Sequence, residues 1–335
     1  MLFTHRPSRL IILFLHFCLV SCLSGTPIYW PTANPAFQKN LGIENYIQAT
    51  ASGKIVSGLF GCVRNDGHKF HEGLDLKATT YGKNKESIDP VFSVMKGIVA
   101  YVNIRDKKSS YGRYVIIEHT DESPSIFSLY AHLKSVNSKI KTGASVKSGQ
   151  VIGIMGRSSS VYDIPKNQTH LHFELGLRLS DNFQSWYDQR KFKSKNDHNI
   201  WNGMNLVGFD PLEYYKSHRT GKINSIHEYL SQLKPACTIK IISNKTPDFI
   251  HRYPSLSTEK FDKKGIKGWD IKFSWYGLPY SWTPLYNLKE DDKQAILSYD
   301  NTLLPLASKR SILSKKGDAV IIGSILNNYL KLLFQ

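Results

Sequence analysis

The sequence predicts a mainly β protein, an antiparallel β-sheet domain followed by a smaller α+β C-terminal region. Short runs rich in β-branched residues recur between glycine-containing turns from about residue 46 to residue 178. Ile98–Val102, Tyr114–Ile117 and Gln150–Met155 are examples, and such recurrence is typical of antiparallel strands. Beyond about residue 222 helical and strand-like segments are mixed. With 335 residues, 41% of them hydrophobic, the chain can bury more than one core.

Residues 1–21 are predicted to be a signal peptide. Basic residues precede the apolar stretch Leu10–Val20, which is shorter than the roughly 20 residues of a membrane-spanning helix. Leu19-Val-Ser-Cys22 then resembles a lipobox, in which the cysteine is lipidated and becomes the first mature residue. The alternative is an ordinary signal cut after Ser24. We therefore expect an exported protein of the cell envelope, on the periplasmic or outer-membrane side, with a lipid anchor at Cys22.

Residues 22–45 contain proline and asparagine and are predicted to be a connector into a domain over residues 46–215. The aromatic and polar residues 179–215 are predicted to be an extension that closes this domain. Once the leader is processed, Cys62 and Cys237 remain. They pair in an oxidising compartment or stay as separate buried thiols, and the sequence leaves both alternatives open.

The segment His170-Leu-His172-Phe-Glu174 is the most constrained candidate site. Side chains alternate along a strand, so His170 and His172 should project from the same face, with Cβ atoms roughly 7 Å apart. That spacing lets one ring bind a metal while the other addresses a water on it. Glu174 continues this face and is predicted to accept the second ring N–H of a neighbouring imidazole.

A second candidate pair, His71 and Asp75, requires a bend in the chain. Positions four apart on an ideal strand are roughly 13 Å from each other, too far to share one ion. Gly73 weakens a helix but permits a bulge or tight bend that draws the two side chains together. The segment is not His-Glu-x-x-His, so Glu72 is not predicted to be a general base.

His132 in Tyr130-Ala-His132-Leu completes the candidate set. Each segment alone also has a structural explanation, because a lone histidine is more often packed or exposed than catalytic. Together the segments supply groups that suit one zinc ion with three protein ligands, plus two further imidazoles. Six other histidines lack comparable partners and are predicted to be structural or solvent-facing: His68, His119, His198, His218, His227 and His251.

These segments and the stretches between them resemble the lysostaphin-type M23 zinc metallopeptidases, also called LytM-like. The resemblance covers about half of the chain and its combined motifs are specific. It is carried by Ser57-Gly-Leu-Phe-Gly, His71-x-Gly-Leu-Asp75, Tyr111-Gly-Arg-Tyr-Val-Ile-Ile-Glu-His119, Leu129-Tyr-Ala-His-Leu133, the glycines Gly143, Gly149, Gly153 and Gly156, and His170-Leu-His-Phe-Glu174.

The resemblance implies that His71, Asp75 and His172 are the ligands of one Zn²⁺ ion, and that His132 and His170 are unligated catalytic imidazoles. It also implies a β-sheet with the metal on the floor of a groove, and hydrolysis of peptide bonds in bacterial peptidoglycan. Zinc can lower the pKa of water to about 7, and a neutral histidine can accept the proton. The other histidine can stabilise the oxyanion, so His132 and His170 share these two tasks jointly.

Two departures from the family pattern concern the surroundings of the metal. A short Gly/Ser-rich turn commonly precedes the final His-x-His, whereas here Arg157–Gln168 forms a longer connection. Some relatives have a tyrosine shortly before the first ligand, where this chain has Arg64, Asn65 and Asp66. Neither departure removes a ligand. Both are expected to reshape the groove, so the resemblance does not name the cleaved bond.

Residues 222–335 are predicted to form a C-terminal domain without a catalytic constellation. Ile223–Leu233 is expected to be helical, Thr238–Ile242 and Trp269–Trp275 to be strands, and Ala319–Phe334 to be a packed terminal helix. The formal charge of +17 favours anionic envelope polymers as partners, and no nucleic-acid motif is present. Ordinary solubility is the alternative explanation of the charge.

The sequence thus predicts an exported zinc metalloendopeptidase acting on the stem or crosslink peptides of peptidoglycan. The competing class is a non-catalytic relative that regulates another wall hydrolase. Such proteins have typically lost metal ligands, whereas all five key positions are present here. A third alternative, a wall-binding module, would draw on the C-terminal half and need no metal.

Overall fold

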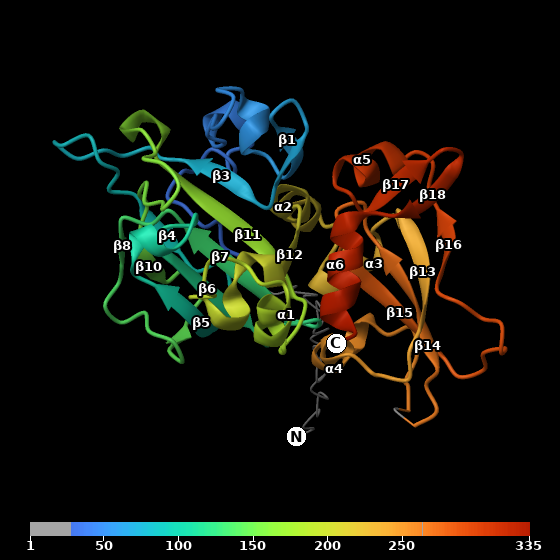
Figure 1. Cartoon of the computed structure of the whole chain (residues 1–335). Coiled ribbons are helices and arrows are strands. Elements are labelled where there is room, and N and C mark those ends of the chain that lie inside the picture. Colours follow the sequence, from blue (N-terminus) through green and yellow to red (C-terminus); the bar gives the residue numbers. More distant parts are fainter. Residues whose placement is uncertain (1–27, 263) are drawn as a thin grey trace, which may run out of the picture.

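A computed structural model describes residues 28–262 and 264–335, so the predicted signal peptide and Cys22 lie outside the described residues. The described chain is mainly β, as predicted. Two parts lie side by side, an N-terminal part built on a seven-stranded sheet and a C-terminal part built on a four-stranded sheet (Figure 1). Among the described residues, no helix has both the length and the apolar character needed to span a membrane.

The seven-stranded sheet is antiparallel, in the order β12-β11-β7-β6-β5-β9, with β3 also paired to β11. Its strands are β3 (Leu74–Lys77), β5 (Gly97–Asn103), β6 (Tyr114–His119), β7 (Ile126–Ala131), β9 (Ser145–Val146), β11 (His170–Arg178) and β12 (Leu206–Phe209).

Both faces of the central strands are covered, which explains their continuous apolar runs. Along β6, Val115 and Ile117 belong to the main hydrophobic cluster, whereas Tyr114 and Ile116 belong to a smaller cluster on the opposite face. That smaller cluster includes Trp201, which is 6% exposed. Most aromatic side chains of residues 179–215 are likewise packed, and Phe192, at 39% exposed, is the exception.

β11 is the longest strand in the described part of the chain. Two strands, β3 and β12, pair with it along one side. Its first half pairs with β3, from His170 opposite Lys77 onward, and its second half pairs with β12, up to Arg178 opposite Leu206. β7 runs along its other side. All nine residues of β11 are buried, so the strand is fixed over its whole length.

The remaining elements of the N-terminal part are short. A three-stranded sheet has the order β4 (Pro90–Phe92), β10 (Val151–Ile154) and β8 (Ser135–Val136), and β1 (Gly61–Arg64) forms a hairpin with β2 (Lys69–His71). The helices are α1 (Phe183–Gln189), α2 (Pro211–Arg219), and the 3₁₀ turns η1 (Ile43–Asn45), η2 (Ile55–Gly58), η3 (Asp106–Lys108), η4 (Lys166–Gln168), η5 (Asn199–Trp201) and η6 (Gly203–Asn205).

The described part of the predicted connector packs against this domain. The rings of Trp30 and Phe37 stack with centroids 4.2 Å apart, and both contact the ring of Tyr215 on α2 edge-on. Trp30 and Phe37 are 3% and 5% exposed, so residues 28–45 contribute to the core.

The C-terminal part is a four-stranded antiparallel sheet with a hairpin and short helices. The sheet has the order β15 (Pro279–Leu285), β14 (Gly268–Phe273), β13 (Cys237–Ile242) and β16 (Ala295–Tyr299). The helices are α3 (Ile226–Ser231), α4 (Asp248–Arg252), η7 (Pro254–Leu256), α5 (Leu304–Lys309) and α6 (Ser324–Leu333).

Most segments predicted for this region are confirmed, and one is partly wrong. β13 and β14 match the two predicted strands, and α3 is a shorter form of the predicted helix. The predicted helix over Ala319–Phe334 begins only at Ser324, because Ala319–Ile322 forms β18 and pairs with β17 (Leu313–Lys316). Tertiary pairing therefore overrides the helical pattern in that stretch.

Hydrogen bonds join the C-terminal part to the end of β11. The main-chain N–H of Arg178 donates to the hydroxyl of Tyr253 at 3.0 Å, and Arg252 donates to the carbonyl of Arg178 at 2.9 Å. α1 also contacts α6. Within the described residues, Cys62 and Cys237 are separate thiols, and burial raises the pKa of Cys237 to about 12.

Candidate metal centre

The register of β11 places Asp75 and His172 directly opposite each other on neighbouring strands. Side chains at such positions have Cβ atoms roughly 5 Å apart. On the other side of β11, His172 is opposite Ala131, and His132 follows directly in the chain. Strand pairing alone therefore gathers three of the five predicted site residues.

A bend at Gly73 brings His71 to the same place. It separates β2 from β3, as predicted, and leaves His71 Nε2 3.1 Å from Asp75 Oδ1. The backbone passes so close to β11 that a Cβ on Gly73 would lie 2.2 Å from the carbonyl oxygen of Phe173. Glycine is needed here because of this close approach.

The three predicted ligands form a compact triangle of donor atoms. His71 Nε2 lies 3.0 Å from His172 Nδ1, and Asp75 Oδ1 lies 3.1 Å from each of them. Donors on a zinc tetrahedron with bonds of 2.0–2.1 Å are roughly 3.3 Å apart. All three residues are buried, at 0%, 0% and 5% exposed. Two imidazoles and a carboxylate at this spacing fit the ligand chemistry of one zinc ion.

The ring nitrogens on the far side of the triangle are held by hydrogen bonds. His71 Nδ1 lies 2.7 Å from the carbonyl oxygen of Leu59, and His172 Nε2 lies 2.8 Å from Glu174 Oε1. The interaction predicted for Glu174 is thus present. Tyr111 also donates to this carboxylate oxygen, at 2.6 Å. These partners fix which nitrogen of each ring faces the metal position.

The second oxygen of Asp75 is held by two residues that the sequence did not assign to the site. The hydroxyl of Thr50 donates to Oδ2 at 2.6 Å, and Arg64 forms an ion pair with the same oxygen. Tyr111 is a third unassigned neighbour, acting through Glu174. Nothing in the spacing along the chain indicates these contacts, because they span 11 to 63 residues.

His132 and His170 lie beside the triangle without belonging to it. Their rings are 4.9 Å apart. Each Nδ1 is near a main-chain carbonyl, of Ser158 at 2.8 Å and of Gln168 at 2.6 Å, and donates its proton there when the ring is neutral. His170 Nε2 is 3.7 Å from Asp75 Oδ1. In both rings this tautomer leaves Nε2 unprotonated and able to accept a proton.

Burial keeps these two imidazoles neutral. It is the largest cause that holds the pKa of His132 well below its usual value, followed by the nearby His170 and His172. Burial likewise lowers the pKa of His170, against an opposing effect of Asp75. Neutral imidazoles at neutral pH are the form required of a general base.

Two of the predicted ligands, Asp75 and His172, have shifted pKa values. Burial would raise the pKa of Asp75, but His71 and His170, with a hydrogen bond to His172, hold it well below its usual value. Burial lowers the pKa of His172, but hydrogen bonds to Asp75 and Glu174 raise it to about 9. A proton held between ligands is what a metal ion displaces on binding.

A cavity of about 290 Å³ adjoins the site through Ser158, which contacts His132 and lines the cavity. The long connection after Gly156 supplies one wall, where Arg157 forms an ion pair with Glu86 at 3.2 Å. The longer connection therefore lines a cavity next to the candidate metal centre.

The histidines predicted to be structural or solvent-facing lie outside the donor triangle. His119 is fully buried, with Nδ1 2.8 Å from the carbonyl oxygen of Lys96 and Nε2 2.7 Å from Ser128 Oγ. His198 is also buried, with a ring nitrogen 3.0 Å from the hydroxyl of Tyr101. His68 and His227 are exposed.

Residues 69–183 match the model of Peptidase family M23. This segment contains all five predicted site residues, and the match confirms the resemblance stated from the sequence. No curated protein matches the chain.

Solved structures with similarity to this chain include peptidases. A zinc-containing peptidase from Vibrio cholerae is 29% identical over 39% of this chain and 33% of its own, with a TM-score of 0.27. A putative glycyl-glycine endopeptidase lytM from Ruminococcus gnavus is 28% identical over 32% of this chain and 39% of its own, with a TM-score of 0.26. The catalytic domain of the antimicrobial peptidase lysostaphin from Staphylococcus simulans is 20% identical over 52% and 96%, with a TM-score of 0.31. The match spans well under two thirds of the first two structures.

Proposed function

We propose that this chain is an exported zinc-dependent endopeptidase that hydrolyses peptide bonds in the stem or crosslink of bacterial peptidoglycan. One observation carries the proposal: a buried triangle of His71 Nε2, Asp75 Oδ1 and His172 Nδ1 with two neutral imidazoles beside it. The match of residues 69–183 to Peptidase family M23 supports the reaction class.

His71, Asp75 and His172 would hold the zinc ion, one ion for the site. Zinc bound there would polarise an amide carbonyl and lower the pKa of water, which is the chemistry that amide hydrolysis needs at neutral pH. Glu174 and Leu59 orient the two ligating rings through their outer nitrogens. Thr50 and Arg64 occupy the second oxygen of Asp75, which leaves Oδ1 for the metal.

His132 and His170 would handle the proton and the developing negative charge. Each has an unprotonated Nε2 in the tautomer fixed by its main-chain contact, so each can accept a proton from the attacking water. Once protonated, an imidazolium can donate to the oxyanion or to the leaving amine. We assign these tasks to the pair jointly, since both rings border the same donor triangle.

The location and the partners are part of the same proposal. The apolar leader and the lipobox-like Leu19–Cys22 support export and a lipid anchor at Cys22. The net charge of +17 supports attraction to anionic envelope polymers as well as to peptidoglycan peptides.

The test is to incubate the zinc-loaded mature protein with intact sacculi and to identify released muropeptides by mass spectrometry. Zinc-dependent release of fragments with new peptide termini is expected, and the termini would name the cleaved bond. Absence of zinc-dependent cleavage across sacculi with several crosslink types would refute the enzyme and favour a regulator that binds without cutting.

A further inference from the structure

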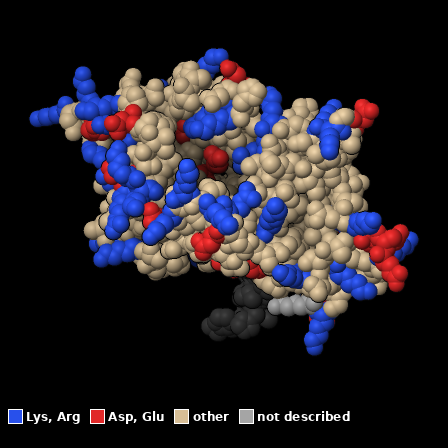
Figure 2. All heavy atoms as spheres, viewed as in Figure 1, with Lys and Arg blue, Asp and Glu red and all other residues tan. Residues whose placement is uncertain are grey.

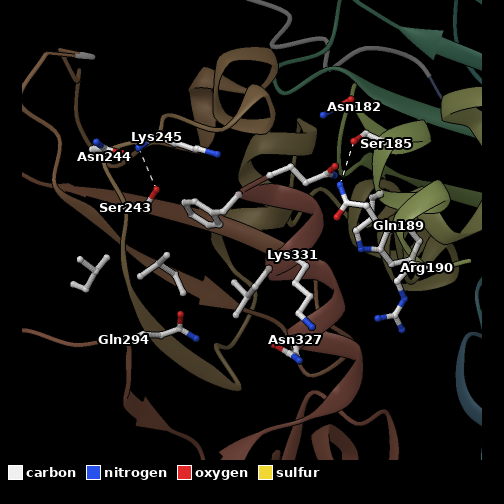
Figure 3. Close-up of a pocket in the computed structure, with 16 residues that line it drawn as sticks. Asn182, Ser185, Gln189, Arg190, Ser243, Asn244, Lys245, Gln294, Asn327 and Lys331 are labelled. Carbon is white, nitrogen blue, oxygen red and sulfur yellow. Dashed lines mark hydrogen bonds between the residues drawn. The ribbon is translucent and has the colours of Figure 1, made fainter.

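A cavity of about 980 Å³ lies where the two parts of the chain meet, well away from the donor triangle. Its walls come from α1, from the end of β13 with the loop after it, from Gln294 and from the last turns of α6 (Figure 3). His172 and Arg178 are six positions apart on β11, roughly 20 Å, and α1 begins beyond Arg178. We call this cavity the α1–α6 groove.

The α1–α6 groove is positively charged. Its lining includes Arg190, Lys245 and Lys331 and no acidic side chain. None of these three cations has an ion-pair partner among the residues that the structure describes. The guanidinium of Arg190 lies over the ring of Trp186, 5.5 Å from its centroid, and is thereby held at the edge of the groove. Figure 2 shows Lys and Arg side chains spread widely over the face of the molecule that it presents.

Carboxamides make up most of the remaining polar lining. Across residues 28–262 and 264–335, no side-chain hydrogen bond engages the amides of four lining residues, Asn182, Asn244, Gln294 and Asn327. Figure 3 shows them on both sides of the groove. The indole N–H of Trp186, a residue only 6% exposed, also lacks an acceptor in the described part of the chain. Free carboxamides both donate and accept, so they match ligands rich in hydroxyl and acetamido groups.

We propose that the α1–α6 groove binds a strand of acetamido sugars bearing carboxylates, remote from the metal centre. Three unpaired cations suit the carboxylates, and the carboxamides suit the sugar hydroxyl and acetamido groups. A polymer whose only polar groups are anionic oxygens would leave the carboxamide oxygens without donors. Naming this polymer as peptidoglycan rests on the proposed function. Holding the glycan here would raise the effective concentration of its peptides at the metal centre.

The test uses the full mature chain without zinc and cosedimentation with purified sacculi. The variant Arg190→Gln/Lys245→Gln/Lys331→Gln removes the three groove cations. A matched control, Lys139→Gln/Lys141→Gln/Lys147→Gln, removes the same charge from exposed lysines outside the groove. We expect the groove variant to bind sacculi about tenfold more weakly, the loss that corresponds to 1.4 kcal/mol. The control should bind within about twofold of the unmodified protein.

A second variant separates recognition from charge. Asn244→Ala/Asn327→Ala keeps the charge and should weaken binding by about threefold, equivalent to one neutral hydrogen bond. Equal binding by all variants would overturn the proposal. An equal loss of binding in the groove variant and its control would also overturn it. Unchanged binding by Asn244→Ala/Asn327→Ala would overturn it as well.

The outcomes also distinguish this proposal from the proposed function. Groove-dependent binding by a zinc-loaded protein that releases no muropeptides would refute the enzyme and leave the groove site standing. The opposite outcome would refute the groove site alone. In that outcome the protein cleaves a short soluble peptide, and the groove substitutions leave its binding to sacculi unchanged.

Discussion

His71 Nε2 and His172 Nδ1 lie 3.0 Å apart although 101 positions separate the two residues in the chain. Different nitrogens of the two rings face each other, because Leu59 and Glu174 occupy the outer ones. Asp75 Oδ1 completes the triangle at 3.1 Å from both. The donor set is therefore assembled by the fold without requiring large side-chain movements.

Replacing His172 with Ala should abolish zinc binding and sacculus hydrolysis together, since one corner of the donor triangle is lost. Zinc content by mass spectrometry and muropeptide release measure the two effects on the same sample. His68→Ala, at an exposed position, is the matched control and should retain both. A His172→Ala protein that still hydrolyses sacculi would contradict its assignment as a ligand.

Replacing His132 with Ala should leave zinc content unchanged and lower kcat by about 10²–10⁴, the usual contribution of a general acid or base. The ring lies beside the triangle and its Nδ1 contacts only the main chain, so no ligand depends on it. Hydrolysis is measured on the zinc-saturated protein. Retained turnover would overturn the role given to this residue.

Replacing Glu174 with Gln should weaken zinc affinity by about 10–100-fold, because the charged acceptor of the His172 N–H is lost. Competition with a chromogenic chelator measures the affinity. The control is Gln184→Glu, which changes the charge at an exposed position on α1. It tests whether a change of charge alone alters the zinc affinity. An unchanged affinity in Glu174→Gln would show that His172 does not need this partner.

Replacing Gly73 with Ala should destabilise the fold by about 1–3 kcal/mol, the usual cost of forcing extra atoms into packed structure. The added Cβ would meet the Phe173 carbonyl, on the strand that carries His172. Urea unfolding measures the loss. Gly82→Ala is the control, because its nearest neighbour would be an ordinary 3.4 Å away. Equal stability of the two variants would contradict the close approach at Gly73.

The buried ring of His119 should make stability depend on pH. Burial lowers the pKa of His119 to about 4 in the folded protein, whereas its pKa in the unfolded chain is about 6.5. Between pH 6.5 and pH 4, therefore, only the unfolded chain takes up the proton. This contribution is therefore present above pH 6.5 and is lost as pH falls to about 4, a loss of about 3 kcal/mol. Unfolding free energies at pH 7 and pH 4 measure it. His119→Gln should lack this part of the slope, whereas exposed His68→Gln should keep it.

Local pattern was enough to predict part of the site. Strand alternation correctly placed His170 and His172 on one face, and Gly73 correctly marked the bend between His71 and Asp75. Both features depend on residues that are close in the chain, where backbone geometry limits the choices.

Strand register could not be predicted in this way. Nothing in the spacing shows that β11 pairs with β3 so that His172 faces Asp75, because any two strands of similar pattern are compatible. The contacts of Thr50 and Arg64 with Asp75, and of Tyr111 with Glu174, follow from that register. The same holds for Ala319–Ile322, which became a strand because β17 was available as a partner.

β11 carries residues of the candidate metal centre and also contacts the C-terminal part. β11 carries Glu174 and the predicted ligand His172, and the amide and carbonyl of Arg178 at its end bond to Tyr253 and Arg252. A recombinant fragment trimmed to end near residue 221 would strip both partners from the Arg178 backbone. Such a fragment would have a looser far end on the strand that carries the predicted ligand His172.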